Sequence, residues 1–229
     1  YYKDMRNVLE YKDGVSFFGS SSGWENKVEM GKGRSAGIEF MAQKTAGKTT
    51  GWLSYTLSKS DRKFTKGGIN NGEWFPYKYD RRHSINLTIN HKFSDRIDIG
   101  ASWVFYTGGT STIPEEKTTV IRPHNGANNG FLWYGTYDNT NSSPTIGDVS
   151  YIEHRNNFRL PASHRLNLGV NFNKKTKHGM RTWNISLYNA YNAMNPAWVY
   201  RGHNKQGLSV IKKYTLLPLI PSFTYTYKF

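Results

Sequence analysis

The sequence predicts an all-β protein, an antiparallel transmembrane β-barrel of which about eight strands are present. Three features predict this fold: apolar and polar residues alternate along most of the chain, long and short connections follow one another in turn, and the chain ends on an aromatic strand. Successive side chains of a strand point to opposite faces, so the alternation produces one apolar and one polar face. Outer-membrane barrels combine short periplasmic turns with long extracellular loops, which matches the second feature.

The stretch 221–229 carries the clearest signal, because its aromatic residues fall on every second position with Ser, Thr and Lys between them. In a soluble protein this strand would be an exposed, aggregation-prone edge strand at a chain end, which proteins usually avoid. In a membrane barrel the aromatic face meets lipid and the polar face meets the lumen. The aromatic residues of this predicted strand are Phe223, Tyr225, Tyr227 and Phe229.

The other strands are predicted by the same period, since apolar pairs such as Ile38 and Phe40, or Ile85 and Leu87, are separated by single residues of polar or small type. Helical periodicity is hard to find. In chain order the predicted strands cover residues 1–11, 34–43, 52–64, 84–93, 97–105, 165–172, 182–188 and 208–229, the last with a bend at Pro218 and Pro221.

The connections between these strands are rich in Gly, Asn, Ser and Pro. Structureless loops as long as some of these would count against a compact soluble domain. The order of lengths predicts a barrel with its C-terminus at the periplasmic side. Long loops are predicted over 12–33, 65–79, 108–162 and 192–207, and short turns over 45–48, 94–96 and 174–179.

Composition excludes several protein classes. Hydrophobic residues make up 37% of the chain, the mean hydropathy is −0.70, and no run of about 18 apolar residues predicts a membrane helix. Only alternate residues of a barrel strand need be apolar, so low hydropathy does not exclude the membrane. The lack of cysteine excludes disulfides, thiolate metal sites and cysteine nucleophiles.

The chain is strongly basic, with 31 Lys and Arg against 16 Asp and Glu and a net charge of +15. Together with 15% aromatic residues, this composition fits a protein that binds single-stranded nucleic acid. It fits equally a barrel that meets anionic lipid head groups or draws anionic ligands into its lumen. The chain opens on Tyr1 without an initiator Met or a signal peptide, so we expect a processed or truncated piece that starts inside an element.

Six motifs, spread across nearly the whole chain, resemble motifs of one protein family and occur in the same order as in that family. They are Gly33-Arg-Ser-Ala-Gly-Ile-Glu39, Gly51-Trp-Leu-Ser-Tyr-Thr-Leu-Ser58, Phe75-Pro-Tyr-Lys-Tyr-Asp-Arg-Arg-His83, Leu160-Pro-Ala-Ser-His-Arg-Leu-Asn-Leu-Gly169, Tyr188-Asn-Ala-Tyr-Asn-Ala-Met-Asn-Pro196 and the terminal Phe229. The chain thereby resembles the C-terminal barrel of TonB-dependent outer-membrane receptors, in the style of Bacteroides-like bacteria.

The resemblance implies a 22-stranded barrel of which residues 1–229 supply roughly the last eight strands. It implies energised uptake across the bacterial outer membrane of a scarce nutrient such as a metal chelate, a cobalamin-like cofactor, a glycan or a peptide. The family's plug domain and TonB-contacting box are absent from this chain. It also implies that the final aromatic strand, ending in Phe229, is the signal for barrel assembly.

The partners that the resemblance implies are outer-membrane lipid and lipopolysaccharide, the barrel-assembly machinery, the TonB complex through a plug not present here, and a surface lipoprotein. Nucleic acid is not expected as a partner. No cofactor is expected.

Aromatic residues in the predicted extracellular loops are the candidate ligand-binding residues. Their rings can stack on sugars or ring-shaped ligands at the barrel mouth. An outer aromatic girdle, or packing of the loops on themselves, explains them equally well. They are Trp74, Tyr77, Tyr79, Trp133, Tyr134 and Tyr137.

Catalysis and metal binding find no support in the sequence. The run of residues 80–83, Asp-Arg-Arg-His, is interpreted as an ion-paired loop-to-strand junction, because charges at loop ends usually position the backbone. The seven His residues show no close metal-type pairing. No nucleophile elbow, phosphate loop or dinucleotide fingerprint occurs, so we expect no catalytic residue and no enzyme.

Two alternatives to the receptor stay open. The strands could close as a complete small barrel that acts as an adhesin or structural protein, although the small inward residues (Ser, Gly, Thr, Asn) suit a wider lumen. The chain could also be a soluble, basic nucleic-acid-binding β protein, which would be water-soluble and would bind DNA in a salt-dependent manner.

Overall fold

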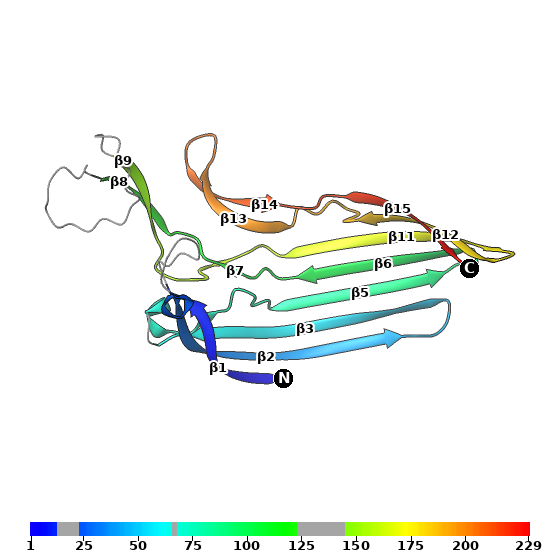
Figure 1. Ribbon diagram of the computed structural model, residues 1–229, viewed down its shortest axis with the longest axis horizontal. Coiled ribbons are helices and arrows are strands. Elements are labelled where there is room, and N and C mark those ends of the chain that lie inside the picture. The colour runs from blue at the N-terminus through cyan, green and yellow to red at the C-terminus, as the bar shows by residue number, and fades with distance from the viewer. Residues whose placement is uncertain (13–22, 66–67, 123–144) are drawn as a thin grey trace.

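The structure is a computed structural model that describes residues 1–12, 23–65, 68–122 and 145–229. Most of the described chain forms one antiparallel sheet with the strand order β1-β2-β3-β5-β6-β11-β12-β15 (Figure 1). The predicted all-β, antiparallel fold is therefore confirmed. The strands along this path are β1 (Tyr2–Tyr11), β2 (Val28–Lys44), β3 (Thr49–Lys63), β5 (His83–Lys92), β6 (Ile97–Tyr106), β11 (Ser163–Thr176), β12 (Gly179–Tyr188) and β15 (Ile220–Lys228).

Smaller elements lie in the long connections. The short strand β4 (Phe75–Pro76) pairs with β3, and the short strands β7 (Thr110–Ser111) and β10 (Phe158–Arg159) pair with each other. Two hairpins project beyond the sheet (Figure 1). They are formed by β8 (Glu116–Arg122) with β9 (Thr145–Tyr151), and by β13 (Pro196–His203) with β14 (Ser209–Thr215); the 3-10 helices are η1 (Trp24–Lys27) and η2 (Ile69–Gly72).

The two ends of the sheet differ in their connections. The turns β2–β3, β5–β6 and β11–β12 lie at the right of Figure 1, where the C-terminus also lies, and we name this the short-turn end. The longer connections and both projecting hairpins gather towards the left, which we name the long-loop end. The predicted alternation of long and short connections is confirmed.

Several predicted loops were wrong in extent. β2 begins at Val28, inside the predicted loop 12–33, because its first residues pair with β1. The region 108–162 holds β7 to β10, and the loop 192–207 holds β13. The predicted single element over 208–229 is two strands, β14 and β15. They are separated where Leu217 adopts a left-handed backbone conformation (φ 59°), which interrupts an extended strand.

The main sheet has one apolar face. Strand register aligns its side chains in rows, because directly opposed residues of an antiparallel pair share a face. Many of these residues are exposed: Ile38 by 73%, Ile185 by 50% and Phe223 by 66%. Parts of two such rows are Ile89–Ala101–Leu168–Leu187 and His91–Ile99–Val170–Ile185–Phe223.

The opposite face of the sheet is polar and hydrogen-bonded. Asp98 accepts hydrogen bonds from the side-chain amides of Asn171 and Asn173, each over 2.7 Å. Asn171 accepts one from the amide of Asn184, and Asn173 accepts one from the hydroxyl of Thr182, again over 2.7 Å. These bonds connect β6, β11 and β12 side by side, so the polar face is an ordered network rather than a row of independent side chains.

Buried apolar residues are few. Among the described residues they are Phe64, Ile69, Phe75 and Ile113, of which the first three form one cluster with Val8 packed against it. All of these residues lie towards the long-loop end, beside the 3-10 helix η2 and the connection after β7. The sheet itself therefore has no hydrophobic core beneath it in the described part of the chain.

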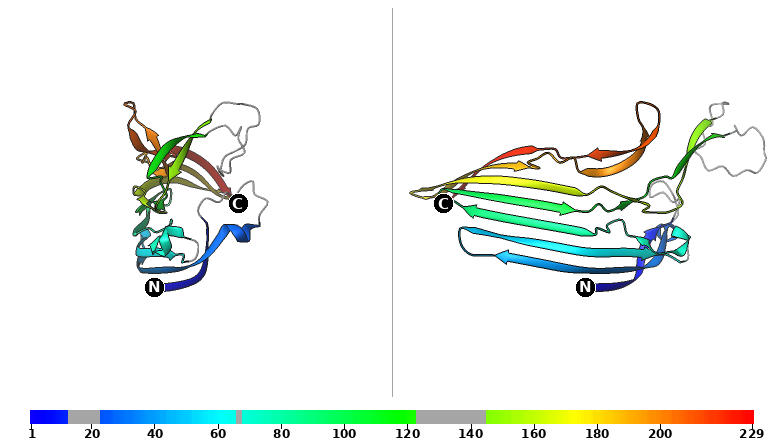
Figure 2. Two further views of the ribbon diagram at one scale, coloured as in Figure 1. Left: turned by 90° about the vertical axis from the view of Figure 1, so that its left-hand side faces the viewer. Right: turned by 180° about the vertical axis from the view of Figure 1, so that it is seen from behind.

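The sheet is open. Along the described path, β1 pairs only with β2 and β15 only with β12. Seen along the strands, the sheet follows an arc (Figure 2). Because no sheet in the described part of the chain closes on itself, closure into a barrel stays a prediction. No described helical segment is long and apolar enough to cross a membrane.

Candidate functional site

The candidate site is the long-loop end of the sheet, and the buried carboxylate of Asp80 organises it. Asp80 is 1% exposed and lies just before β5. Its Oδ2 is 2.7 Å from a guanidinium nitrogen of Arg159 and 3.3 Å from Nε of Arg82. Its Oδ1 accepts the backbone N–H of Ser60 over 2.7 Å. A buried carboxylate is stable only with such partners, so the ion pairs explain its position.

Arg159 extends this junction to a third segment. The same guanidinium donates to the backbone carbonyls of Asp80, over 2.7 Å, and Gly108, over 2.9 Å. It therefore joins the connections before β5, after β6 and before β11. The interpretation of residues 80–83 as an ion-paired loop-to-strand junction is confirmed by these contacts.

Asparagine side chains link the connections next to β11, β12 and β15 at the long-loop end. The buried side chain of Asn189 donates to the carbonyls of Ala193 and Leu217 and accepts the N–H of Ala193. Asn192 accepts the N–H of Leu219, and Asn195 exchanges two hydrogen bonds with the backbone of His164. The Asn-rich motif of residues 188–196 thus connects β11, β12 and the start of β15, which is a structural role.

The predicted ligand-binding aromatics fall into two groups. Tyr77 and Tyr79 contact each other edge to face, with ring centres 5.4 Å apart, and Tyr79 is 62% exposed. Trp74 is 37% exposed and lies under the guanidinium of Arg34, which is 4.3 Å from the ring centre. The other group, Trp133, Tyr134 and Tyr137, lies outside the described residues. Ligand binding by these residues stays a prediction.

Arginine–aromatic pairs at this end were not predicted. The guanidinium of Arg62 is 4.1 Å from the ring centre of Tyr77, and that of Arg81 is 3.8 Å from Tyr106. Stacking leaves the N–H edges of a guanidinium free to bind carboxylate or phosphate groups. A third pair, Arg165 with Tyr188, is also joined by a hydrogen bond from the guanidinium to the phenol oxygen.

Lys78 adds to the positive charge of this end. A hydrogen bond with Tyr79 raises the pKa of the Lys78 ammonium group above its ordinary value, and burial opposes the rise only in part. The lysine therefore keeps its charge at neutral pH. With the stacked Arg62 and Arg81 it makes this part of the rim suited to anionic or ring-shaped ligands.

The β13–β14 hairpin carries an aromatic surface, and its β13 residues Trp198 and Tyr200 fall in the predicted loop 192–207. The rings of Trp198 and Tyr214 stack with centres 4.5 Å apart and planes 5° apart. The register places Tyr200 two residues along the same strand, and hence on the same face. All three residues are exposed by between 43% and 49%. The alternation of Trp198 and Tyr200 is the signal that could have revealed this strand.

The proposed assembly strand has the predicted alternation. On β15, Phe223 is 66% exposed, Tyr225 50% and Tyr227 40%, and the terminal Phe229 is fully exposed. The ring of Trp183 on β12 contacts both Phe223 and Tyr225, with centres 5.0 and 4.4 Å apart. The role of these residues in assembly stays a prediction.

Comparisons with protein-family models, curated proteins and solved structures find no match for this chain. Functional assignment therefore rests on the geometry of the sheet and of its long-loop end.

Proposed function

We propose that this chain is the C-terminal barrel portion of a TonB-dependent outer-membrane receptor that takes up a scarce nutrient. The exposed apolar face of the main sheet carries the proposal. Extended exposed apolar patches mark a surface that meets a partner or a membrane. In a membrane barrel the apolar side of each strand faces lipid and the opposite side faces a polar lumen. The main sheet has both an apolar and a polar face, as such a barrel needs.

The dimensions of the strands support a membrane environment. A transmembrane strand needs about 9–11 residues. The strands β5, β6 and β12 each contain 10 residues and β15 contains 9. The longer strands β2 and β3, with 17 and 15 residues, would extend beyond the bilayer.

Aromatic residues at both ends of the apolar face support lipid rather than a protein partner. Near the long-loop end the indole of Trp103 donates to the hydroxyl of Tyr191 over 3.1 Å, and that hydroxyl is 2.8 Å from Nδ1 of His164. Near the short-turn end lie Trp183 and Tyr225. Amphipathic rings with a polar tip are typical of the two water–lipid boundaries.

The open arc of the sheet supports a large barrel. A small eight-stranded barrel closes with its interior filled by side chains. Here both edge strands are unpaired along the described path, and many positions of the polar face carry small residues (Ser, Gly, Thr and Asn). This arrangement suits a wide lumen that holds a plug. The plug and the contact with TonB belong to the proposal through family resemblance alone.

The proposal is tested on the native protein extracted from cell envelopes. We expect it in the outer-membrane fraction, soluble only in detergent, with heat-modifiable migration in a gel. Its intact mass should be several times the 26.3 kDa of this chain. A native mass near 26.3 kDa would favour the complete small barrel, and a water-soluble protein that binds DNA in a salt-dependent manner would favour the nucleic-acid binder.

Transport is tested separately in living cells. Uptake of labelled glycan, peptide, metal chelate and cobalamin is compared between the parent strain and a strain that lacks the gene. We expect the strain that lacks the gene to lose uptake of one nutrient class. In the parent strain, uptake of that nutrient should stop when the proton-motive force is collapsed. Uptake that is unchanged for all four classes would contradict the receptor assignment while leaving a membrane barrel intact.

Deleting Phe229 should lower the amount of folded protein in the outer membrane severalfold, because the terminal aromatic strand is the proposed assembly signal. The matched control is Phe93→Ala, which removes another exposed ring, 57% exposed and located next to a short turn. Heat-modifiable protein in membrane fractions measures assembly. Equal levels of the deletion and the control would remove the assembly role from Phe229.

A further inference from the structure

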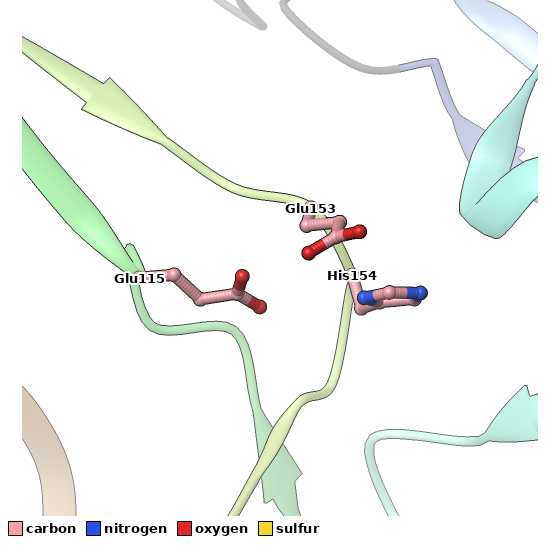
Figure 3. A group of neighbouring side chains, drawn as sticks. All are labelled: Glu115, Glu153 and His154. Atoms are coloured by element: carbon pink, nitrogen blue, oxygen red, sulfur yellow. The ribbon is translucent and has the colours of Figure 1, made fainter.

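Three potential metal ligands converge beside the β8–β9 hairpin. A carboxylate oxygen of Glu115, a carboxylate oxygen of Glu153 and a ring nitrogen of His154 all lie within 4.8 Å of one another. In Figure 3 the side chain of Glu115 points from one leg of the hairpin towards Glu153 and His154 on the other leg. Because the three residues come from two distant stretches of sequence, their spacing in the chain gave no sign of a metal site.

The backbone at this place is held by the fold. Glu115 immediately precedes β8, and its N–H donates to the carbonyl of Tyr151, the last residue of β9, over 2.9 Å. The side chain of Asn157 exchanges two hydrogen bonds with the backbone of the buried Ile113, over 2.9 and 2.8 Å. The two legs are therefore fixed relative to each other on both sides of the ligand cluster.

A neighbouring side chain also orients one ligand. The amide of Asn157 donates to Oε1 of Glu115 over 3.0 Å, leaving the other carboxylate oxygen for a metal. Hydrogen bonds of this kind hold ligating carboxylates in place in known metal sites. Arg155, the residue after His154, is also held in place, because its N–H donates to the side chain of Asn70 over 2.7 Å.

The charges at this place favour a cation. Within the described part of the chain, neither Glu115 nor Glu153 forms an ion pair, although the protein carries 31 Lys and Arg residues. Three arginines of the rim form ion pairs elsewhere: Arg159 with Asp80, Arg34 with Asp61 and Arg155 with Glu10.

The donor set selects the kind of ion. Carboxylate oxygens alone would suit Mg²⁺ or Ca²⁺, whereas an imidazole nitrogen with carboxylates suits Zn²⁺. Zn²⁺ binds His nitrogen and carboxylate oxygen at about 2.0–2.2 Å, so ligand atoms around it lie roughly 3.4 Å apart. The three side chains are exposed and can rotate. Movements of about 1 Å at their ligand atoms would bring all three within bonding distance of one ion.

We propose that Glu115, Glu153 and His154 bind a single Zn²⁺ ion at the base of the β8–β9 hairpin, with water in the remaining coordination position. The ion would cross-link the two legs of the hairpin and fix it to the long-loop end. This site does not depend on the transport function, since its ligands belong to the described fold alone.

The experiment uses the full chain in detergent, with Zn²⁺ titrated against a chromophoric chelator. We expect one equivalent of Zn²⁺ to bind. The variants Glu115→Gln, Glu153→Gln and His154→Asn should each weaken binding by more than about tenfold, since loss of an outer-shell partner alone costs 10–100-fold. Absorption by bound Co²⁺ provides a second readout, and the His154→Asn variant should lose the signal of imidazole coordination.

Matched controls separate this site from incidental binding. His178→Asn removes an exposed His from the turn at the opposite end of the sheet, and Glu39→Gln removes an exposed carboxylate from β2. Both variants should bind Zn²⁺ like the unmodified chain. Equal Zn²⁺ affinity in the unmodified chain and in the triple variant of the three ligands would overturn the site, as would stoichiometric binding of Ca²⁺ in place of Zn²⁺.

Discussion

Replacing Ile89 with Arg should destabilise the folded protein in lipid by about 2–4 kcal/mol, the cost of an arginine on the lipid face near the bilayer midplane. Ile89 lies in the central row of the apolar face and is 39% exposed. In water a substitution at such an exposed position usually changes stability by less than about 0.5 kcal/mol. The free energy of unfolding is measured by urea titration in phospholipid vesicles.

The neighbouring residue provides the control. Asn90 is also exposed on β5 but belongs to the polar face, opposite Thr50 and Gly100. Gly100 leaves space beside it, so Asn90→Arg should change the free energy of unfolding by no more than about 0.5 kcal/mol. If both variants lose the same stability, or neither loses any, the apolar face does not meet lipid.

Replacing Asp80 with Ala should lower the free energy of unfolding by about 3 kcal/mol, because it leaves a partly buried guanidinium without its anion. Arg159 is 35% exposed, and its two hydrogen bonds to backbone carbonyls would keep it in place after the carboxylate is removed. The N–H of Ser60 would also lose its acceptor. Urea unfolding followed by Trp fluorescence measures the change.

Asp95→Asn is the matched control for the buried ion pair. Asp95 lies in a short turn, its side chain is 84% exposed, and it is 2.8 Å from Lys92. This hydrogen bond lowers the pKa of the Asp95 carboxyl. Exposed ion pairs contribute little to stability, so we expect no measurable change. An equal effect of both substitutions would show that solvent screens the Asp80 ion pairs as well.

Features with a local pattern could be predicted from the sequence. A strand buried or lipid-facing on one side must alternate with period two, and this period is visible in residues 85–93 or 223–229 without knowing any partner strand. The turn over 45–48 is marked by its own composition and lies where it was predicted. The ion-paired role of Asp80 followed from its position at a loop end.

Features made by distant contacts could not be predicted. The hairpins β8–β9 and β13–β14 project beyond the sheet, where no common apolar face imposes a long alternating pattern, and β13 shows only the short alternation of Trp198 and Tyr200. The stacking of Trp198 on Tyr214 depends on the register of that hairpin. The meeting of Glu115 with His154 depends on how the chain returns to the base of β8. Spacing in the sequence carries no information on such contacts.

The amino-acid sequence alone therefore decides that the chain forms two-faced antiparallel strands, with short turns at one end and long connections at the other, because periodicity and turn composition act locally. Only the tertiary structure decides which side chains meet across the long connections: Arg159 with Asp80, the arginines with their tyrosines, and the three proposed Zn²⁺ ligands. The physical reason is that strand register brings together residues far apart in the chain, and register is a property of the whole sheet.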